Sequence, residues 1–190
     1  YPKTLNPIIY SSADEADIIS GYTIFESLVD TDPDTGEAVC WLCTSFEYDA
    51  KNKKIATFNL RKDVNFHDGK KMTAHDVKFS FTVMMHPKVD NLNNKSDVIA
   101  AIDKVDIVDD YTVKITFKDV KYANIYSLMG VTVIPKHLFP YFAKSPDKFN
   151  KDKKFGRSPI GSGPYKFKKW QAGKFVELTR NEKWWGFKEK

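Results

Sequence analysis

The sequence predicts an α+β fold built on antiparallel strand pairs. Segments in which apolar and polar residues alternate occur in pairs joined by short turns: 105–108 with 112–117 around Asp109-Asp110-Tyr111, and 165–170 with 175–179 around Gln171-Ala172-Gly173. Two other segments, 13–29 and 74–86, repeat apolar residues at helical spacing. The chain shows no internal repeat and no low-complexity segment.

The first predicted helix covers 13–29, where Ile18, Tyr22, Phe25 and Val29 recur at helical spacing. The segment Ser12-Ala13-Asp14-Glu15 precedes them and has the form of a capping box, with Ser12 as the N-cap and Glu15 three positions later. A turn is predicted next, at Asp32-Pro33-Asp34-Thr35-Gly36.

The middle of the chain predicts a strand, a tight turn and a capped helix. Residues 55–60 form the strand, and Asp68-Gly69 is a strong turn dipeptide because glycine accepts positive φ without steric cost. Thr73 and Asp76 form a second capping box at the start of a helix over 74–86, which ends before Pro87.

The remaining segments are expected to be short helices, one extended segment and loops. They are a loop with a short helix at 88–100, a helix at 122–129, an extended segment at 131–134, a short helix at 135–141 and a charged loop at 144–157.

The composition is that of a globular protein. Of the 190 residues, 42% are hydrophobic and 14% aromatic, enough for a packed core. No apolar run approaches the ~20 residues that span a membrane. The net charge is +5, but Lys and Arg alternate with Asp and Glu, and even the basic stretch 144–157 contains Asp147 and Asp152. We interpret these charges as a solvated surface and predict no nucleic-acid partner.

Cys40-Trp41-Leu42-Cys43 is a C-x-x-C motif, which in thioredoxin-like enzymes opens a helix that lowers the thiol pKa. Here the motif follows a turn and precedes Thr44-Ser45-Phe46-Glu47. Two cysteines alone cannot complete a tetrahedral zinc site. Buried thiols or an incidental disulfide are the structural interpretation, and a small redox or metal protein using Cys40 and Cys43 is the alternative from another functional class.

His67, Asp68, His75 and Asp76 are the other candidates for metal chemistry. His67 and His75 are eight positions apart across a turn rather than four apart on one helix, and the two aspartates already have turn and capping roles. The sequence contains no nucleophile elbow, phosphate-binding glycine loop or paired-carboxylate motif. We therefore predict no catalytic residue, no metal site and no cofactor.

The stretch from Phe58 to Val77 closely resembles the signature F-x-L-R-x-x-V-x-F-H-D-G-x-x-x-T-A-x-D-V of the extracellular solute-binding proteins (family 5) that serve peptide ABC transporters. Four further segments resemble motifs of this family in the same order: Thr4-Leu5-Asn6-Pro7, Ile24-Phe25-Glu26-Ser27-Leu28-Val29, Pro159-Ile160-Gly161-Ser162-Gly163-Pro164-Tyr165-Lys166-Phe167 and Asn181-Glu182-Lys183-Trp184-Trp185-Gly186. The chain departs from the family pattern at Ser27, Glu182 and Trp184, which replace Gly, Pro and Tyr.

The resemblance implies a periplasmic-binding-protein-like fold of type II, in the peptide-binding cluster, whose two lobes close over a ligand. Residues 1–25 and 158–190 would then belong to the first lobe, and 26–157 would form a smaller subdomain with mixed or antiparallel strands inserted into it. The second lobe would be absent, so we expect this chain to be a piece of a longer protein, its N-terminal part.

The resemblance also suggests ligand-binding residues. Ser11, Ser12 and Ala13 lie at a loop-to-helix junction that borders the peptide cleft in the family, where a helix N-terminus offers free N–H groups. Gly161, Ser162 and Gly163 lie where the chain passes between lobes and approaches a ligand closely. The alternatives are a simple helix cap for the first group and a plain tight turn for the second. Trp184 and Trp185 are expected to pack the lobe.

The function implied is binding without catalysis. The intact protein would capture di- or oligopeptides in the periplasm or outside the cell and deliver them to an ABC permease in the membrane; a lipid anchor is left open. Its partners would be the peptide, the permease and the second lobe of the same polypeptide. A nickel, oligosaccharide or opine binder of the same fold is one alternative, and a structural or regulatory interaction module that reuses the inserted subdomain is another.

Overall fold

The computed structural model describes residues 2–10, 15, 23–90 and 95–188. Its strands are β1 (Val29–Thr31), β2 (Ala38–Cys40), β3 (Cys43–Tyr48), β4 (Ile55–Leu60), β5 (Ile102–Asp109), β6 (Thr112–Phe117), β7 (Tyr165–Gln171) and β8 (Phe175–Arg180). Its α-helices are α2 (Ala74–Met85), α3 (Lys95–Ala101) and α4 (Lys153–Arg157), and its 3₁₀ helices are η1 (Tyr122–Gly130), η2 (Lys136–Leu138), η3 (Pro146–Lys151) and η4 (Trp185–Lys188). All strand pairs are antiparallel, so the predicted α+β class is confirmed.

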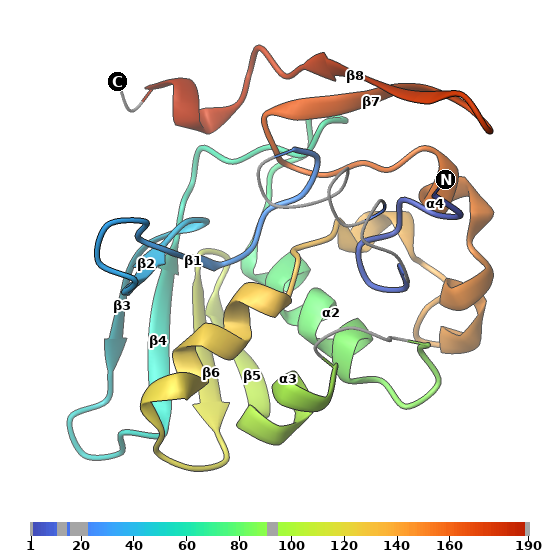
Figure 1. Ribbon diagram of the computed structural model, residues 1–190. Coiled ribbons are helices and arrows are strands. Elements are labelled where there is room, and N and C mark those ends of the chain that lie inside the picture. Colours follow the sequence, from blue (N-terminus) through green and yellow to red (C-terminus); the bar gives the residue numbers. More distant parts are fainter. Residues whose placement is uncertain (1, 11–14, 16–22, 91–94, 189–190) are drawn as a thin grey trace.

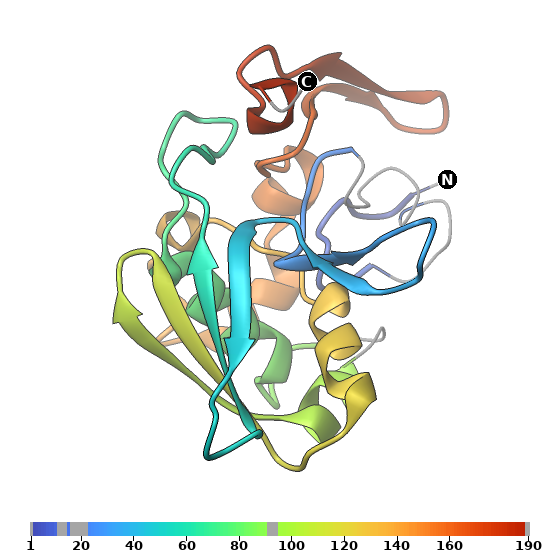
Figure 2. The same ribbon diagram turned by 90° about the vertical axis from the view of Figure 1, so that its left-hand side faces the viewer.

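The largest sheet has four strands in the order β3-β4-β6-β5. Its register places Phe46 opposite Phe58, Phe58 opposite Val113, and Val113 opposite Ile107, so these four apolar side chains share one face. Helix α2 packs against β5 and β6, and η1 and α3 pack on each other beside it (Figures 1 and 2). The core therefore lies between one face of this sheet and the helices.

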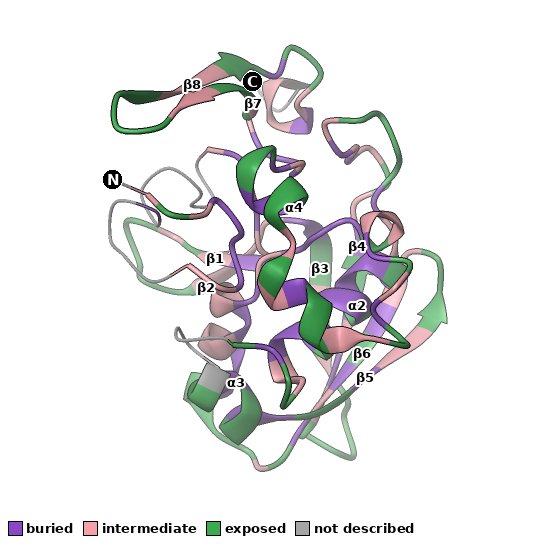
Figure 3. Ribbon diagram, turned by 90° about the vertical axis from the view of Figure 1, so that its right-hand side faces the viewer, coloured by how far each residue is buried: buried purple, intermediate pink, exposed green. Residues whose placement is uncertain are grey.

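The turn at Asp68-Gly69 and the capped helix that follows it form as predicted. Gly69 adopts φ +87°, the left-handed conformation that glycine accepts without strain. One oxygen of the Asp76 carboxylate accepts hydrogen bonds from the backbone N–H (2.9 Å) and the hydroxyl (3.1 Å) of Thr73, and the other accepts from the N–H of Lys136 (2.9 Å). Asp76 thus also attaches the segment around Lys136 to the start of α2. Helix α2 is buried along most of its length (Figure 3).

The two predicted hairpins are also present. β5 pairs with β6, and β7 pairs with β8 around Gly173, which has φ +73°. The second hairpin lies apart from the four-stranded sheet, above α4 (Figure 1), and the guanidinium carbon of Arg157 lies 4.0 Å from the ring centre of Trp170. Local alternation and turn residues were therefore sufficient to predict both hairpins.

The predicted helix over 13–29 is wrong at its C-terminal end. Ser27 forms a β-bridge with Thr132, the carbonyl of Glu26 accepts from the N–H of Val133 (2.9 Å), and Val29 begins β1. These bonds to a distant segment replace the local bonds that a helix would make. Residues 11–14 and 16–22, which carry the rest of this prediction, lie outside the described residues.

The predicted loop at 144–157 is also wrong, because it contains η3 and α4. The Asp152 side chain caps α4 by accepting from the N–H of Phe155 (3.0 Å). Phe149 and Phe155 are buried, with ring centres 5.1 and 4.9 Å from that of Phe139. The loop was predicted from the many charged residues of this segment, whereas the burial of Phe149 and Phe155 against Phe139 determines its structure.

The shorter predictions hold with small changes. The 122–129 helix is the 3₁₀ helix η1, the short helix at 135–141 is reduced to η2, and α3 is the helix expected within 88–100. No helix in the described ranges has both the length and the apolar character needed to cross a lipid bilayer.

Two residues near the start of the chain are hydrogen-bonded to residues 156 and 165. The N–H of Leu5 donates to the carbonyl of Gly156 (2.8 Å), and the N–H of Tyr165 donates to that of Thr23 (3.0 Å). The division into 1–25, 26–157 and 158–190 stays a prediction. The Tyr165–Thr23 bond joins its first and last parts, whereas the Leu5–Gly156 bond joins its first part to the end of its middle part.

Candidate functional site

The predicted segment Gly161-Ser162-Gly163 crosses the chain at residues 23–25, backbone against backbone. The N–H of Gly163 donates to the carbonyl of Ile24 (2.9 Å). A Cβ on Gly161 would lie 2.0 Å from the carbonyl oxygen of Ile24, and one on Gly163 would lie 2.3 Å from that of Thr23. Both positions therefore require glycine because another strand of backbone occupies the space of a side chain.

Ser162 points to a buried carboxylate. Its hydroxyl donates to Oε2 of Glu26 at 2.6 Å, while Oε1 accepts from the indole N–H groups of Trp41 (2.9 Å), Trp184 (2.9 Å) and Trp185 (3.1 Å). Glu26 has no exposed surface. Burial raises the pKa of Glu26, and the hydrogen bonds from Ser162 and the three indoles oppose that rise. We call these five residues the Glu26 cluster.

The Glu26 cluster joins segments that are far apart in the sequence. The ring centres of Trp41 and Trp185 are 5.4 Å apart, and those of Trp184 and Trp185 are 5.3 Å apart. The guanidinium carbon of Arg61 lies 3.9 Å from the ring centre of Trp185. Trp185 is part of the hydrophobic core and Trp184 packs against it, as expected for packing residues. Their common acceptor and the contribution of Trp41 were missed. The available signal was a single carboxylate in the apolar run Ile24 to Val29.

Cys40 and Cys43 form a disulfide between the end of β2 and the start of β3. This bond closes the short loop that presents Trp41 to Glu26. Neither cysteine opens a helix, which is the setting that activates a thioredoxin-like pair. The geometry therefore gives this pair a structural role beside the Glu26 cluster.

His67 supports the glycine crossing. Its Nδ1 accepts from the N–H of Gly161 (3.3 Å) and its Nε2 donates to the carbonyl of Gly163 (3.0 Å), which requires the neutral ring with the proton on Nε2. Burial lowers the pKa of His67 to about 4. The carbonyl of Gly163 also accepts from the side-chain amide of Asn181 (3.0 Å).

The other candidates for metal chemistry have separate partners. Asp68 binds His137 Nε2 at 2.6 Å, His75 lies 3.8 Å from Asp110, and Asp76 caps α2. Within the described ranges, no group of three or more His, Cys, Asp or Glu side chains is arranged to hold a metal ion.

Comparison with known proteins decides the family. A sequence model of the bacterial extracellular solute-binding proteins, family 5, middle region, matches residues 37–190. The chain belongs to this family. Oligopeptide-binding protein AppA of Bacillus subtilis is 34% identical over 128 residues, which are 65% of this chain and 22% of AppA.

Solved structures agree with the family assignment. The structure of AppA from Bacillus subtilis in complex with a nonapeptide is 27% identical in sequence and has a TM-score of 0.82; the match covers 97% of this chain and 35% of the AppA chain. The structure of NikZ from Campylobacter jejuni in complex with Ni(L-His) is 32% identical and has a TM-score of 0.76; the match covers 96% of this chain and 34% of the NikZ chain. The structure of MoaA from A. tumefacien R10 in complex with mannopinic acid is 29% identical and has a TM-score of 0.78; the match covers 97% of this chain and 36% of the MoaA chain.

The chain spans 22% to 32% of the length of the curated relatives it matches. It therefore corresponds to one part of a family 5 protein. The predicted resemblance and the periplasmic-binding-protein-like fold of the peptide-binding cluster are confirmed.

In this family 5 chain, one polar pocket lies directly beside the glycine crossing. It measures about 380 Å³ and is lined by Asn65, Phe66, His67, Asp68, Gly69, Lys166, Asn181 and Lys183. It shares His67 and Asn181 with the contacts that hold Gly163 in position. Its two lysines give it a positive rim.

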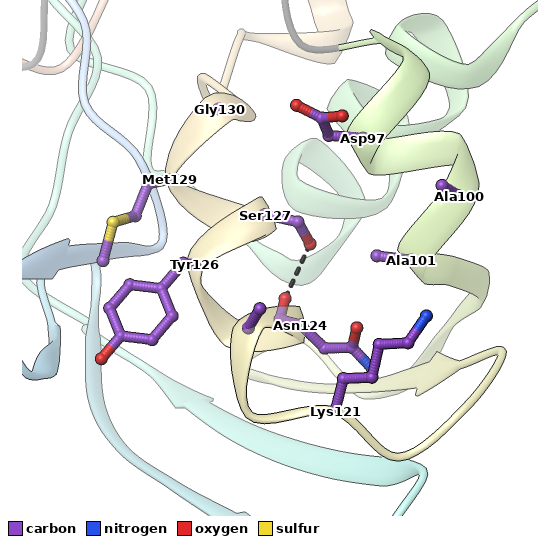
Figure 4. Close-up of a pocket in the computed structure, with 10 residues that line it drawn as sticks. Asp97, Ala100, Ala101, Lys121, Asn124, Tyr126, Ser127, Met129 and Gly130 are labelled. Atoms are coloured by element: carbon purple, nitrogen blue, oxygen red, sulfur yellow. Dashed lines mark hydrogen bonds between the residues drawn. The ribbon is translucent and has the colours of Figure 1, made fainter.

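A second pocket of about 580 Å³ lies between α3 and η1 (Figure 4). Asp97 and Lys121 carry its charges, and the Ser127 hydroxyl donates to the backbone carbonyl of Asn124 (2.7 Å). Half of its lining residues are Ala, Ser or Gly, and its polar groups do not converge on one point (Figure 4). We assign no ligand to it.

The remaining predicted ligand residues, Ser11, Ser12 and Ala13, lie outside the described residues. Next to them, the buried carboxylate of Glu15 accepts from the backbone N–H of Thr4 (2.9 Å). Gly161, Ser162 and Gly163 are buried and bonded within the chain. Ligand binding by either group stays a prediction.

Proposed function

We propose that the whole protein is the solute-binding component of an ABC transporter and captures peptides outside the cytoplasm for a membrane permease. The observation that carries this proposal is the match of 97% of the chain to AppA, a structure solved with a nonapeptide, at a TM-score of 0.82. The family model over residues 37–190 supports the same assignment.

The proposed mechanism is binding by two lobes without catalysis. Extended peptides are recognised mainly through main-chain hydrogen bonds, with roomy pockets for varied side chains. In this chain, the Glu26 cluster and the glycine crossing would act as a rigid frame where the first lobe meets the inserted subdomain. The segment Ser11 to Ala13 would supply free N–H groups, and Gly161 to Gly163 would set the path of the backbone beside the ligand.

Two observations favour a second candidate, a small solute as the cargo. NikZ, at 32% identity, was solved with Ni(L-His), and MoaA, at 29% identity, was solved with mannopinic acid. A nickel complex or an opine is therefore the alternative ligand on the same fold.

Calorimetry tests the proposal on the full-length protein and on the 190-residue chain. A mixed library of di- to pentapeptides should bind the full-length protein with micromolar or tighter Kd and bind the chain alone at least 100-fold more weakly. The ordering cost of a flexible peptide persists when the contacts of the second lobe are missing. Nickel with histidine and mannopinic acid are the comparison ligands. Binding of either one by full-length protein that ignores peptides would refute the peptide assignment.

A further inference from the structure

A long groove runs along α2 on the side where the 136–146 segment crosses it. It measures about 740 Å³, and we call it the α2 groove. Three lysines and three phenylalanines lie among its lining residues, which are Lys70, Lys71, Thr73, His75, Asp76, Phe79, Thr82, His86, Lys136, His137, Phe139, Pro140, Phe142, Ala143 and Pro146. His75, Phe79, Thr82 and His86 follow one stripe of the helix, so the groove extends about 16 Å at the rise of an α-helix.

The floor of the α2 groove is aromatic. The ring of Phe79 lies 5.7 Å from that of Phe139 and 5.3 Å from that of Phe142, and the ring of His86 lies 5.5 Å from that of Phe142. The Thr82 hydroxyl donates to the carbonyl of Lys78 (2.8 Å), so the helix backbone already binds it. The middle of the groove therefore suits an apolar chain rather than a polar one.

Positive charge gathers at one end of the α2 groove. Lys70 and Lys71 precede α2, and Lys136 is attached to its first turn by the Asp76 bond. All three lysines are exposed. Across the described ranges, no carboxylate lies within salt-bridge distance of their ammonium groups.

The nearby carboxylates are hydrogen-bonded to other groups but keep their negative charge. Asp68 binds His137 (2.6 Å), Asp110 lies 3.8 Å from His75, and buried Asp76 is bonded to Thr73 and to the N–H of Lys136. The lining of the groove itself carries the three lysines against the single carboxylate of Asp76. This end of the groove therefore keeps a net positive charge and complements an anion.

We propose that the α2 groove binds a single-chain anionic amphiphile, namely a fatty-acid carboxylate, with its head at Lys70, Lys71 and Lys136 and its chain over Phe79, Phe139 and Phe142. A saturated chain of about twelve carbons has a length similar to that of the groove when extended. The volume lies within the usual range of small-molecule sites, about 300–1,000 Å³. This site is separate from the glycine crossing and does not depend on the proposed transport cargo.

Calorimetry of the 190-residue chain with dodecanoate below its micelle concentration, at pH 7.5, tests the site. We expect one saturable site. The variant K70Q/K71Q/K136Q should weaken binding at least tenfold, whereas the matched control K51Q/K151Q/K174Q, which removes three exposed lysines elsewhere, should change it less than twofold.

Two further arms separate the head from the chain. Dodecyltrimethylammonium, which has the same chain with a cationic head, should not bind. Ala143→Trp, at an exposed position in the lining, should fill the groove and weaken dodecanoate binding at least tenfold while leaving the circular dichroism spectrum unchanged. Absence of saturable dodecanoate binding, equal weakening by the two triple variants, or equal binding of the cationic detergent would each overturn the assignment.

Discussion

Replacing the buried carboxylate of Glu26 tests the physical account of the Glu26 cluster. Glu26→Leu puts an apolar side chain of broadly similar size in place of the carboxylate and removes every acceptor, so three indole N–H groups and the Ser162 hydroxyl lose their partner. A buried donor left without a partner costs about 1–3 kcal/mol. Four such donors at the low end cost about 4 kcal/mol, a large share of the about 5–15 kcal/mol that stabilises an ordinary domain.

Glu26→Gln is the matched control. Its remaining oxygen still accepts from the three indoles, and its amide nitrogen donates to Ser162 Oγ, which changes from donor to acceptor. Loss of the stronger charged bonds is offset by relief from burying a charge. We expect the free energy of unfolding to stay within about 1 kcal/mol of the parent, in the range of an ordinary hydrogen bond.

Urea denaturation followed by far-UV circular dichroism measures both variants, because the tryptophans themselves are part of the perturbation. With a denaturant slope of about 2 kcal/mol per M, Glu26→Leu should lower the midpoint by about 2 M. A Glu26→Leu midpoint within 0.5 M of the parent (about 1 kcal/mol), or equal losses in the two variants, would refute the reasoning.

The pH dependence gives an independent check on Glu26. Its pKa is raised on folding, so the folded state binds more protons than the unfolded state just above the ordinary glutamate pKa of 4.5. The contribution of Glu26 to stability is therefore greatest below that value and falls as pH rises through the folded pKa. The Gln variant should lack this fall when unfolding free energies are compared across pH.

Three further predictions concern the crossing and the helix cap. Folding lowers the pKa of His67 from 6.5 to about 4. Its contribution to the free energy of unfolding is therefore full above pH 6.5 and is lost as pH falls toward 4, by about 3 kcal/mol in all. In His67→Gln, urea midpoints should lack this sensitivity to acid, and a pH profile equal to that of the parent would exclude His67 as the source. Gly161→Ala should destabilise the chain by several kcal/mol, about 3 or more, because its Cβ would lie 2.0 Å from the carbonyl oxygen of Ile24; a melting temperature within 2 °C of the parent (under about 1 kcal/mol) would contradict the crossing. Thr73→Ala should cost about 1 kcal/mol because the hydroxyl bond to Asp76 is lost, and an unchanged urea midpoint would show that the hydroxyl contributes nothing.

Much of the fold was predictable because it depends on neighbours in the sequence. The β7–β8 hairpin follows from alternation around a glycine at positive φ, and the start of α2 follows from Thr73 and Asp76 three positions apart. The family resemblance came from the same local motifs. Such features depend only on residues a few positions apart in the sequence, so their pattern can be recognised without knowing the tertiary structure.

The sequence by itself therefore determined the α+β class, both hairpins, the capped helix and the family. Only the tertiary structure decided the partners of Glu26, since Trp184 and Trp185 lie 158 and 159 residues away. It also decided that Ser27 is extended rather than helical, because Thr132 bridges it, and that 144–157 is helical, because Phe139 packs on its aromatic residues. Residues distant in sequence stabilise the carboxylate of Glu26, the glycines at the backbone crossing and the aromatic residues of 144–157. No local pattern therefore specifies which partners these groups meet.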